Sequence, residues 1–377
     1  MSSCDTRHPH AHFGFEVVSG YFVFDEPTRN PASFPAIPEN FGLLPNRTWS
    51  SLVADVQQWN EEAQAAGKGT EYKLVFAARH GEGFHNVAEA KYGTEAWDAK
   101  WALLNGDGEA IWGPDPELTP IGEDQARSVN REWQRQLHLS SQSKDHAPLP
   151  TKLFSSPLKR SSRTLQLSYE GLLLPPGTIP PGGEGKAVGA PYVKEDLREQ
   201  YGNDNTCINR STKSEIQRNF PHFEIEQGFT EEDERFKVSL AEGREVAKVL
   251  GRSSIEAPYI TDGLRENYRD VHTCDERSTR SVVKGYNPGW TIEPGFTEED
   301  GAFGKIHETV DEMTTRVAKA LKDIFQLSKG HQVIHISSHS GVMESLWRAT
   351  NHKHFKPATG AIVPLVVKFD PTSSSLN

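Results

Sequence analysis

The chain has few cysteines and no long apolar run. Its 377 residues include Cys4, Cys207 and Cys274, and no two of them have the CxxC spacing. This scarcity excludes a disulfide framework and a cysteine-based zinc or redox motif, and it indicates a reducing compartment. No apolar segment approaches the roughly 20 residues that cross a bilayer, and residues 1–15 lack the apolar stretch of a signal peptide. We therefore expect a cytoplasmic protein with no membrane partner.

Positive charge is also scarce. The sequence has 41 Lys and Arg residues against 52 Asp and Glu residues, and its formal net charge is −11. This balance argues against nucleic acid as a partner, because phosphate backbones require a basic face. A small phosphorylated substrate needs only a local group of arginines. The alternating His8, His10 and His12 have no cysteine or carboxylate to complete a tetrahedral set, so we expect no metal and no cofactor. The sequence leaves the oligomeric state open.

One stretch, residues 73–86, organises the chain. Its apolar run Leu74-Val75-Phe76-Ala77-Ala78 is typical of a strand buried on both faces, and the strand ends at Arg79-His80-Gly81-Glu82. In open α/β sheets, ligands bind at the carboxyl ends of the strands. Taken alone, this pattern is equally typical of an ordinary strand followed by a polar turn.

Three further motifs follow in order: Leu118-Thr119-Pro120-Ile121-Gly122 with Gln125-Ala126, Ser156-Pro157-Leu158-Lys159-Arg160 with Thr164, and Ser338-His339-Ser340-Gly341. With Arg79-His80-Gly81-Glu82 and Asn86, they resemble the histidine phosphatase superfamily, also called phosphoglycerate-mutase-like. The resemblance implies an α/β fold, a three-layer α/β/α sandwich whose mostly parallel sheet has helices on both faces. We expect one domain over residues 1–377. Within it, residues 1–48 are expected to form an extended N-terminal arm on the surface.

The hydrophobic pattern agrees with this fold, because predicted strands and helices alternate along the chain. Helices are expected at 49–66, 86–92, 119–137, 157–172 and 305–327 and after Gly341, and strands at 74–78, 152–155, 332–337 and 361–369. Pro364 lies within the last predicted strand, which favours an edge position or a bulge there.

The resemblance implies that His80 is the nucleophile, which attacks phosphorus and becomes phosphohistidine. A neutral imidazole nitrogen is nucleophilic near pH 7. Arg79 and Arg160 match the two phosphate-binding arginines of the family, and a guanidinium group can bind phosphate through two hydrogen bonds. The alternative for Arg160 is an ordinary position on a helix surface.

The resemblance gives His339 the role of a second histidine that faces the first. Asn86 matches a neutral phosphate donor, and backbone N–H groups at Gly341 would add donors at a helix amino terminus. His339 could instead be a hydrogen-bonded core histidine, and Asn86 a helix N-cap. Glu82 is expected to orient the pocket rather than react.

A duplication lies between the third and fourth motifs. Residues 197–236 recur as 264–303 without a gap, with 20 of 40 positions identical, and the match extends back to 190–192 and 257–259. We interpret 190–303 as an inserted lid region that contains two copies, 190–236 (copy one) and 257–303 (copy two), offset by 67 residues. Either both copies contact substrate, or one does and the other is surface decoration.

The duplication offers the family's proton-donating carboxylate twice, as Glu199 in Leu-Arg-Glu-Gln-Tyr and as Glu266 in Leu-Arg-Glu-Asn-Tyr. Glu199 follows Arg160 at the usual interval. Glu266 keeps the His-Thr-Cys-Asp continuation that resembles this branch of the family, so the sequence slightly favours Glu266.

The expected function is hydrolysis of a small phosphorylated metabolite by a cofactor-independent phosphomonoesterase. Two alternatives are a phosphoglycerate-mutase-type phosphotransferase and a non-catalytic protein that binds a phosphorylated ligand. The mutase would need a lid that excludes water, and the non-catalytic protein would need a broken catalytic set.

Overall fold

A central sheet organises the computed structural model, which describes residues 13–26, 28, 34–174, 190–201, 205–233 and 309–374 and the backbone of 259–260 and 291–292. Its strands run in the order β1, β9, β2, β8, β3, β4, β5. Their bounds are β1 Phe15–Val17, β2 Glu71–Arg79, β3 Lys152–Ser155, β4 Tyr192–Val193, β5 Glu224–Ile225, β8 Val333–Ser338 and β9 Ile362–Phe369. The neighbouring strands β2, β8, β3, β4 and β5 pair in parallel, whereas β9 is antiparallel to β1 and β2. The mostly parallel sheet is therefore confirmed.

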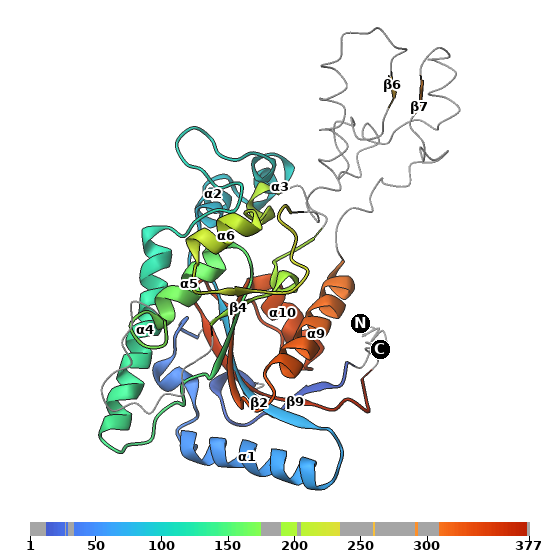
Figure 1. Ribbon diagram of the computed structural model, residues 1–377. Coiled ribbons are helices and arrows are strands. Elements are labelled where there is room, and N and C mark those ends of the chain that lie inside the picture. The colour runs from blue at the N-terminus through green and yellow to red at the C-terminus, as the bar shows by residue number, and fades with distance from the viewer. Residues whose placement is uncertain are drawn as a thin grey trace, which may run out of the picture.

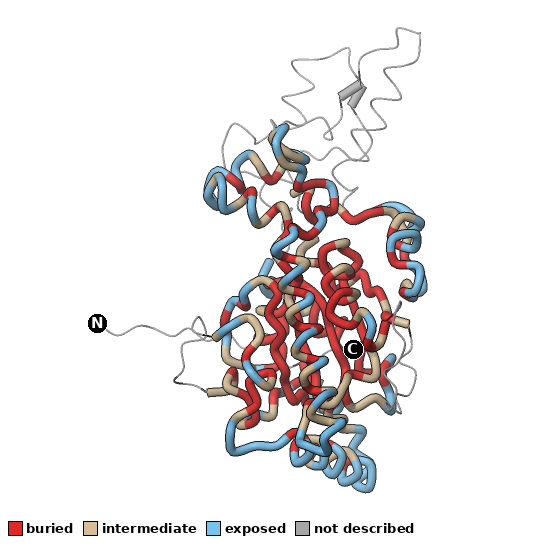
Figure 2. The backbone as a smooth tube through the Cα atoms, turned by 90° about the vertical axis from the view of Figure 1, so that its left-hand side faces the viewer, coloured by how far each residue is buried: buried red, intermediate tan, exposed pale blue. Residues whose placement is uncertain are grey.

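Helices cover both faces of this sheet (Figure 1). One layer contains α1 (Trp49–Ala65), α4 (Pro120–Ser141) and α5 (Lys159–Tyr169), and the other contains α9 (Val310–Leu327) and α10 (Ser340–Ala349). Trp49 of α1 and Trp133 of α4 both pack on Phe76 of β2, with ring centroids 6.0 and 5.0 Å apart. The buried residues follow the sheet and the inner helix faces (Figure 2), which confirms the three-layer α/β/α fold. Among the described residues, no helix is both long and apolar enough to cross a membrane.

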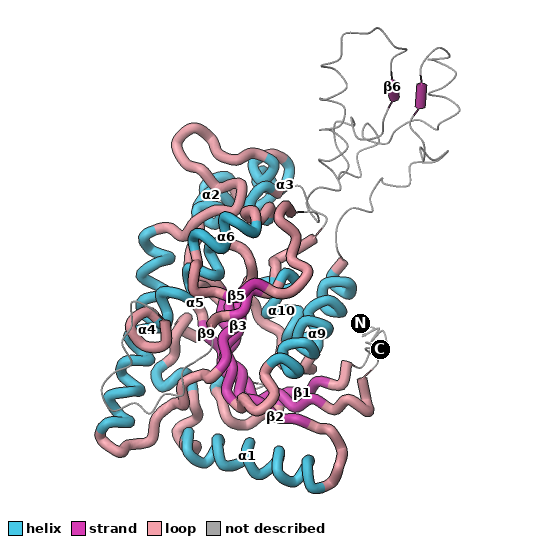
Figure 3. Tube along the Cα trace, viewed as in Figure 1, coloured by secondary structure: helices cyan, strands magenta, loops and turns pink. Residues whose placement is uncertain are grey.

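Smaller elements gather beyond the carboxyl ends of the central strands (Figures 1 and 3). They are α2 (Phe84–Tyr92), α3 (Thr94–Ala99), α6 (Lys213–Asn219) and the short 3₁₀ turns η4 (Trp101–Leu103) and η6 (Thr206–Ile208). Trp97, Trp112 and Ile208 form part of a separate buried cluster that joins α2, α3, η4 and η6. Further 3₁₀ turns are η1 (Val23–Asp25), η3 (Glu39–Gly42) and η5 (Glu195–Leu197). These elements form a cap over the edge of the sheet where the motifs converge.

The described part of the expected N-terminal arm does more than lie on the surface. β1 extends the sheet by pairing Phe15 with Phe369 of β9. Phe22 and Phe41 are fully buried, and the Phe41 ring lies 4.4 Å from that of Trp133. The segment lacks helical or strand periodicity because its aromatic side chains enter the core from an irregular backbone, so pattern analysis treats it as surface chain.

Pro364 does not place β9 at the edge of the sheet, because β1 and β2 flank this strand. Arg79 donates its backbone N–H to Ala361 O at 2.9 Å. Hydrogen-bonded pairs alternate in an antiparallel ladder, so the Phe76–Pro364 pair is a non-bonded one. The proline nitrogen therefore faces away from β2, and β1 pairs only with Val367 and the two residues after it. The proline removes no ladder hydrogen bond, which explains why it is tolerated here.

The duplication reappears in the strand pairing. In copy one, β4 pairs in parallel with β5, with Tyr192 opposite Glu224. In copy two, β6 (Tyr259–Ile260) pairs in parallel with β7 (Thr291–Ile292), with Tyr259 opposite Thr291. Both strands are displaced by the repeat length, since 259 − 192 and 291 − 224 are each 67. The rest of copy two, including Glu266, lies outside the described residues.

Candidate active site

Two histidines face each other where β2 and β8 end. The strands are parallel neighbours in which Arg79 is paired with Ser338, so the residues that follow, His80 and His339, leave the sheet side by side. His80 also donates its backbone N–H to Ser338 O at 2.9 Å. Both side chains are fully buried, and their ring centroids lie 5.1 Å apart. The first and fourth motifs are thus brought together by one strand register.

Hydrogen bonding fixes the tautomer of His80. Its Nδ1 lies 2.6 Å from Gly81 O, and a carbonyl oxygen only accepts, so Nδ1 carries the proton. This leaves a lone pair on Nε2. Burial is the main cause that holds the pKa of His80 well below its usual range, and the guanidinium groups of Arg160 and Arg79 lower it further. His80 is therefore neutral near pH 7, the state that a nucleophile needs.

Arg160 connects His80 to copy one. It lies in the first turn of α5, and its side chain is fully buried. Its Nε donates toward His80 Nε2 at 3.3 Å, its Nη1 donates to Cys207 O at 2.7 Å, and its Nη2 donates to Glu199 Oε2 at 2.8 Å. The same Glu199 oxygen lies 3.9 Å from His339 Nδ1. The structure therefore places Glu199 beside both histidines and rules out a surface position for Arg160.

Gly81 and Gly122, from two different motifs, allow the turn after β2 to contact the backbone at the start of α4. A Cβ atom at Gly81 would lie 2.2 Å from Gly122 O, and one at Gly122 would lie 2.0 Å from Glu82 O. Thr119 donates its side-chain hydroxyl to Glu82 Oε1 at 2.7 Å, so Glu82 links the turn after β2 to the amino terminus of α4. Gly81 N–H donates to Thr164 Oγ1 at 3.0 Å, which adds the third motif. The expectation that Glu82 orients the pocket rather than reacts stays a prediction.

Comparison with known proteins finds relatives with phosphoglycerate mutase names. No protein-family model matches the chain. A probable phosphoglycerate mutase of Arthroderma benhamiae is 27% identical over 96% of this chain and 86% of its own length. The probable phosphoglycerate mutase PMU1 of Saccharomyces cerevisiae is 29% identical over 90% of this chain and 94% of its own length. The chain is therefore similar over most of its length to proteins named as phosphoglycerate mutases. A solved phosphoglycerate mutase from Bacillus anthracis aligns over 80% of this chain and 90% of its own, with 13% identity and a TM-score of 0.36.

The other residues matched to the superfamily also lie around this centre. Arg79 donates through Nη1 to Pro357 O at 2.8 Å, and its Nε is buried without a partner among the described residues. Asn86 is the third residue of α2 and not its N-cap, which is Gly83, and its Oδ1 accepts the N–H of Gly83 at 3.0 Å. Gly341 lies in the first turn of α10, whose N-cap is His339. Their positions are compatible with the phosphate contacts that the resemblance implies.

Asp115 is a supporting residue that the sequence does not reveal. Its fully buried carboxylate accepts the N–H of Lys159 at 2.9 Å and both the N–H and hydroxyl of Ser211, at 2.9 and 2.8 Å. Burial raises the pKa of this carboxyl group above its usual range, while these donors oppose the rise. Asp115 thereby ties the start of α5, next to Arg160, to copy one. No motif contains it, and only the fold brings its partners together.

Buried ion pairs hold the segment that carries Glu199. Arg198 donates to Glu195 at 2.9 Å and to Asp233 at 2.7 Å, and Arg210 donates to Glu195 at 2.9 Å. Breaking a buried pair of this kind is strongly destabilising, because the remaining charge is left uncompensated. This network fixes the backbone on either side of Glu199.

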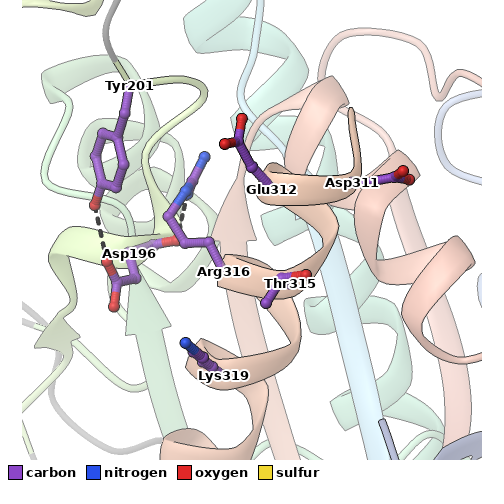
Figure 4. Close-up of a pocket in the computed structure, with 7 residues that line it drawn as sticks. All are labelled: Asp196, Tyr201, Asp311, Glu312, Thr315, Arg316 and Lys319. Carbon is purple, nitrogen blue, oxygen red and sulfur yellow. Dashed lines mark hydrogen bonds between the residues drawn. The ribbon is translucent and has the colours of Figure 1, made fainter. Parts of the chain in front are cut away.

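Arg316 of α9 supports the same segment from a pocket of about 530 Å³ (Figure 4). Its Nη1 donates to Asp196 O at 2.7 Å and to Arg198 O at 3.0 Å. Tyr201, whose hydroxyl donates to Asp196 Oδ1 at 2.9 Å, lines the pocket as well. None of the residues matched to the superfamily's catalytic or phosphate-binding set lines this pocket. We therefore assign Arg316 the role of holding the segment that carries Glu199.

Sequence reasoning missed His85. It lies in the first turn of α2, is buried, and has its ring centroid 5.4 Å from that of His80. His80, His85 and Glu199 offer ligand atoms within 4.8 Å of one another, so a group with metal-ligand spacing exists at the site. No sequence motif pointed to His85, and only the structure shows that a Cβ at Gly83 would lie 2.7 Å from its ring.

Proposed function

We propose that the protein is a phosphomonoesterase that hydrolyses a small phosphorylated metabolite through a phosphohistidine at His80. The observation that carries this proposal is the neutral His80, whose Nε2 lone pair lies 3.3 Å from Arg160 Nε and whose ring lies beside His339 and Glu199. The curated relatives carry phosphomutase or phosphoglycerate mutase names, which supports phosphoryl transfer as the reaction class.

In the first step, the Nε2 lone pair of His80 attacks phosphorus, and the bond between phosphorus and the ester oxygen breaks. Arg160, Arg79 and His339 stabilise the charge on the phosphoryl oxygens, since this transfer depends mainly on positioning and electrostatics. A carboxyl group donates a proton to the departing oxygen. We assign that role to Glu199, whose Oε2 lies 3.9 Å from His339 Nδ1 beside the reacting groups. In the free site Glu199 is a carboxylate paired with Arg160. The phosphoryl group takes over this guanidinium, and Glu199 accepts the acidic proton of the monoester monoanion and passes it to the ester oxygen.

In the second step, water attacks the phosphohistidine and loses its proton to the Glu199 carboxylate. The bond between phosphorus and Nε2 breaks, inorganic phosphate forms, and His80 returns to its neutral state. The proton then leaves with the phosphate, so Glu199 returns to the carboxylate of the free site, as a catalytic cycle requires. No metal enters this scheme, because the guanidinium groups supply the positive charge.

A phosphoglycerate mutase is the second candidate, favoured by the names of the relatives from Arthroderma benhamiae and Saccharomyces cerevisiae. A mutase returns the phosphoryl group to its substrate, whereas a phosphatase transfers it to water. A panel of phosphorylated metabolites, assayed for released phosphate beside a coupled assay for phosphoglycerate isomerisation, separates the two. We expect phosphate release that His80→Ala abolishes. Isomerisation without phosphate release would replace the phosphatase by the mutase, and binding without turnover would favour a non-catalytic protein.

A further inference from the structure

His85 has no role in the scheme above, although its ring centroid lies 5.4 Å from that of His80. It belongs to the first turn of α2 and is 6% exposed. Its Nδ1 is buried and has no hydrogen-bond partner among the described residues. A buried polar group without a partner is destabilising, so a histidine with a purely structural role is expected to have one.

The buried His335 of β8 provides a comparison. Its Nδ1 lies 3.1 Å from the Tyr169 hydroxyl, so its ring is held by one protein partner, whereas its Nε2 has none among the described residues. Burial alone lowers the pKa of His335, to about 3. The pKa of His85 is lowered first by burial and then by Arg160, His80 and Arg79. His85 thus lies in the electrostatic field of the catalytic cations, and His335 does not.

The charges around His85 decide between a cation and an anion as its ligand. His80, His85 and Glu199 are close enough to hold a metal ion. However, the Glu199 carboxylate is already paired with Arg160 at 2.8 Å, and Arg79 contributes a second guanidinium. Two cationic groups against one carboxylate favour an anion over a divalent cation.

We propose that His85 is a third imidazole of the site, which donates an N–H to an oxygen of the transferred phosphoryl group. The inference rests on the proposed function in that its ligand is a phosphoryl group. A neutral imidazole has one donor nitrogen, which a phosphoryl oxygen can accept from. His80 would then attack phosphorus while His85 and His339 contact the oxygens around it.

Gly83 links this role to the local backbone. A Cβ atom at this position would lie 2.7 Å from both Cε1 and Nδ1 of His85, closer than real contacts allow. Glycine at position 83 therefore leaves the space that the His85 ring occupies. Gly83→Ala must displace that ring, so it provides a second perturbation of His85 that leaves the imidazole intact.

The test is calorimetric titration of inorganic phosphate and orthovanadate into the full chain, with no turnover required. We expect His85→Ala to weaken binding by about 10- to 100-fold, the effect of losing one charge-assisted hydrogen bond. Gly83→Ala should weaken binding in the same direction. His85→Asn and His85→Gln place an amide near Nδ1 and Nε2, respectively, and the one that matches the donor nitrogen should restore part of the affinity.

Two controls separate binding from folding. Val87→Ala changes the same helix at an exposed position, and His335→Ala removes a buried histidine outside the site. Both should retain phosphate affinity, and His335→Ala should lower the melting temperature. Phosphate affinity of His85→Ala within twofold of wild type would overturn the proposal, as would tight, His85-dependent binding of Zn²⁺ alone.

Turnover gives an independent readout. A donor to a phosphoryl oxygen acts equally on all esters, so kcat/KM of His85→Ala should fall by similar factors for alkyl and aryl phosphates. A loss confined to alkyl phosphates would place His85 on the leaving oxygen instead and refute the proposed contact. If the wild-type chain binds phosphate through His85 but hydrolyses nothing, the proposed function fails while the phosphate contact stands.

Discussion

Glu199→Gln, with Glu266→Gln as its matched control, tests which copy of the duplication provides the acid. Both glutamates follow a Leu-Arg pair and precede an amide and a tyrosine. A general acid must lie within roughly 3 Å of the leaving oxygen, so only one of them can act. Glu199 lies at the described site, 2.8 Å from Arg160, whereas Glu266 lies outside the described residues. We therefore expect only the Glu199 variant to be defective.

The size of the defect follows from the contacts of Glu199. Glutamine keeps an oxygen that can accept from Arg160 Nη2, so the fold and the position of Arg160 should persist. What is lost is the transferable proton, typically a factor of about 10²–10⁴ in rate, or about 2.7–5.4 kcal/mol in activation free energy. Phosphate affinity should stay equal or increase, because fully buried Arg160 loses its counter-charge.

The assay compares an alkyl phosphate with p-nitrophenyl phosphate, whose phenolate leaves without a proton. We expect Glu199→Gln to lose the full factor on the alkyl ester and less than about tenfold on the aryl ester. Glu266→Gln should remain near wild type on both. A selective defect in Glu266→Gln with a normal Glu199→Gln would show that copy two supplies the acid and would refute the assignment from the structure. Equal, mild effects would exclude both residues.

Three further predictions concern the charges of the site. Arg160→Lys should lower kcat/KM by about 10- to 150-fold, since lysine cannot reproduce the contacts to His80, Glu199 and the substrate, each about 1.5–3 kcal/mol; wild-type kinetics would place Arg160 outside the reaction. EDTA should leave phosphatase activity intact, and a loss that added metal restores would contradict charge stabilisation by arginines. The pKa values of His80, His85 and His339 are depressed in the folded state, which therefore favours the neutral imidazoles. Their contribution to the free energy of unfolding is present above about pH 6.5 and is lost as the pH falls. Each should lower the free energy of unfolding by up to about 1.4 kcal/mol per pH unit, and urea titrations that give equal stability at pH 7.5 and 5 would refute this.

The candidate site was predictable because its motifs lie at fixed points of a parallel sheet. Residues that follow neighbouring parallel strands meet at one edge, so His80 and His339 had to be close once both strands were recognised. The small residues also carry information: Gly81 and Gly122 have backbone contacts that exclude a Cβ. A strand pattern and a glycine are local features, which is why sequence analysis detects them.

Features that depend on distant contacts were not predictable. Asp115 contacts Lys159 and Ser211, and nothing near it in the sequence indicates either partner. The sequence assigns His85 no role, since its proximity to Glu199 depends on how copy one folds back over the sheet.

The choice between the two copies illustrates the same limit. The buried network of Glu195, Arg198, Arg210 and Asp233 has counterparts at the repeat offset, namely Asp262, Arg265, Arg277 and Asp300. Both copies therefore carry the residues that hold the acid in place. Sequence slightly favours Glu266, and contact with Arg160 favours Glu199. Local sequence patterns cannot distinguish two segments that carry matching residues at these positions.

Detection of the phosphorylated intermediate tests the central claim most directly. The chain is mixed with a radiolabelled substrate, quenched in alkali, which preserves phosphohistidine, and digested for mapping of the label. We expect the label on the peptide that contains His80, and its absence from His80→Ala. Label on another residue, or rapid phosphate release by the His80→Ala variant, would contradict covalent catalysis by His80.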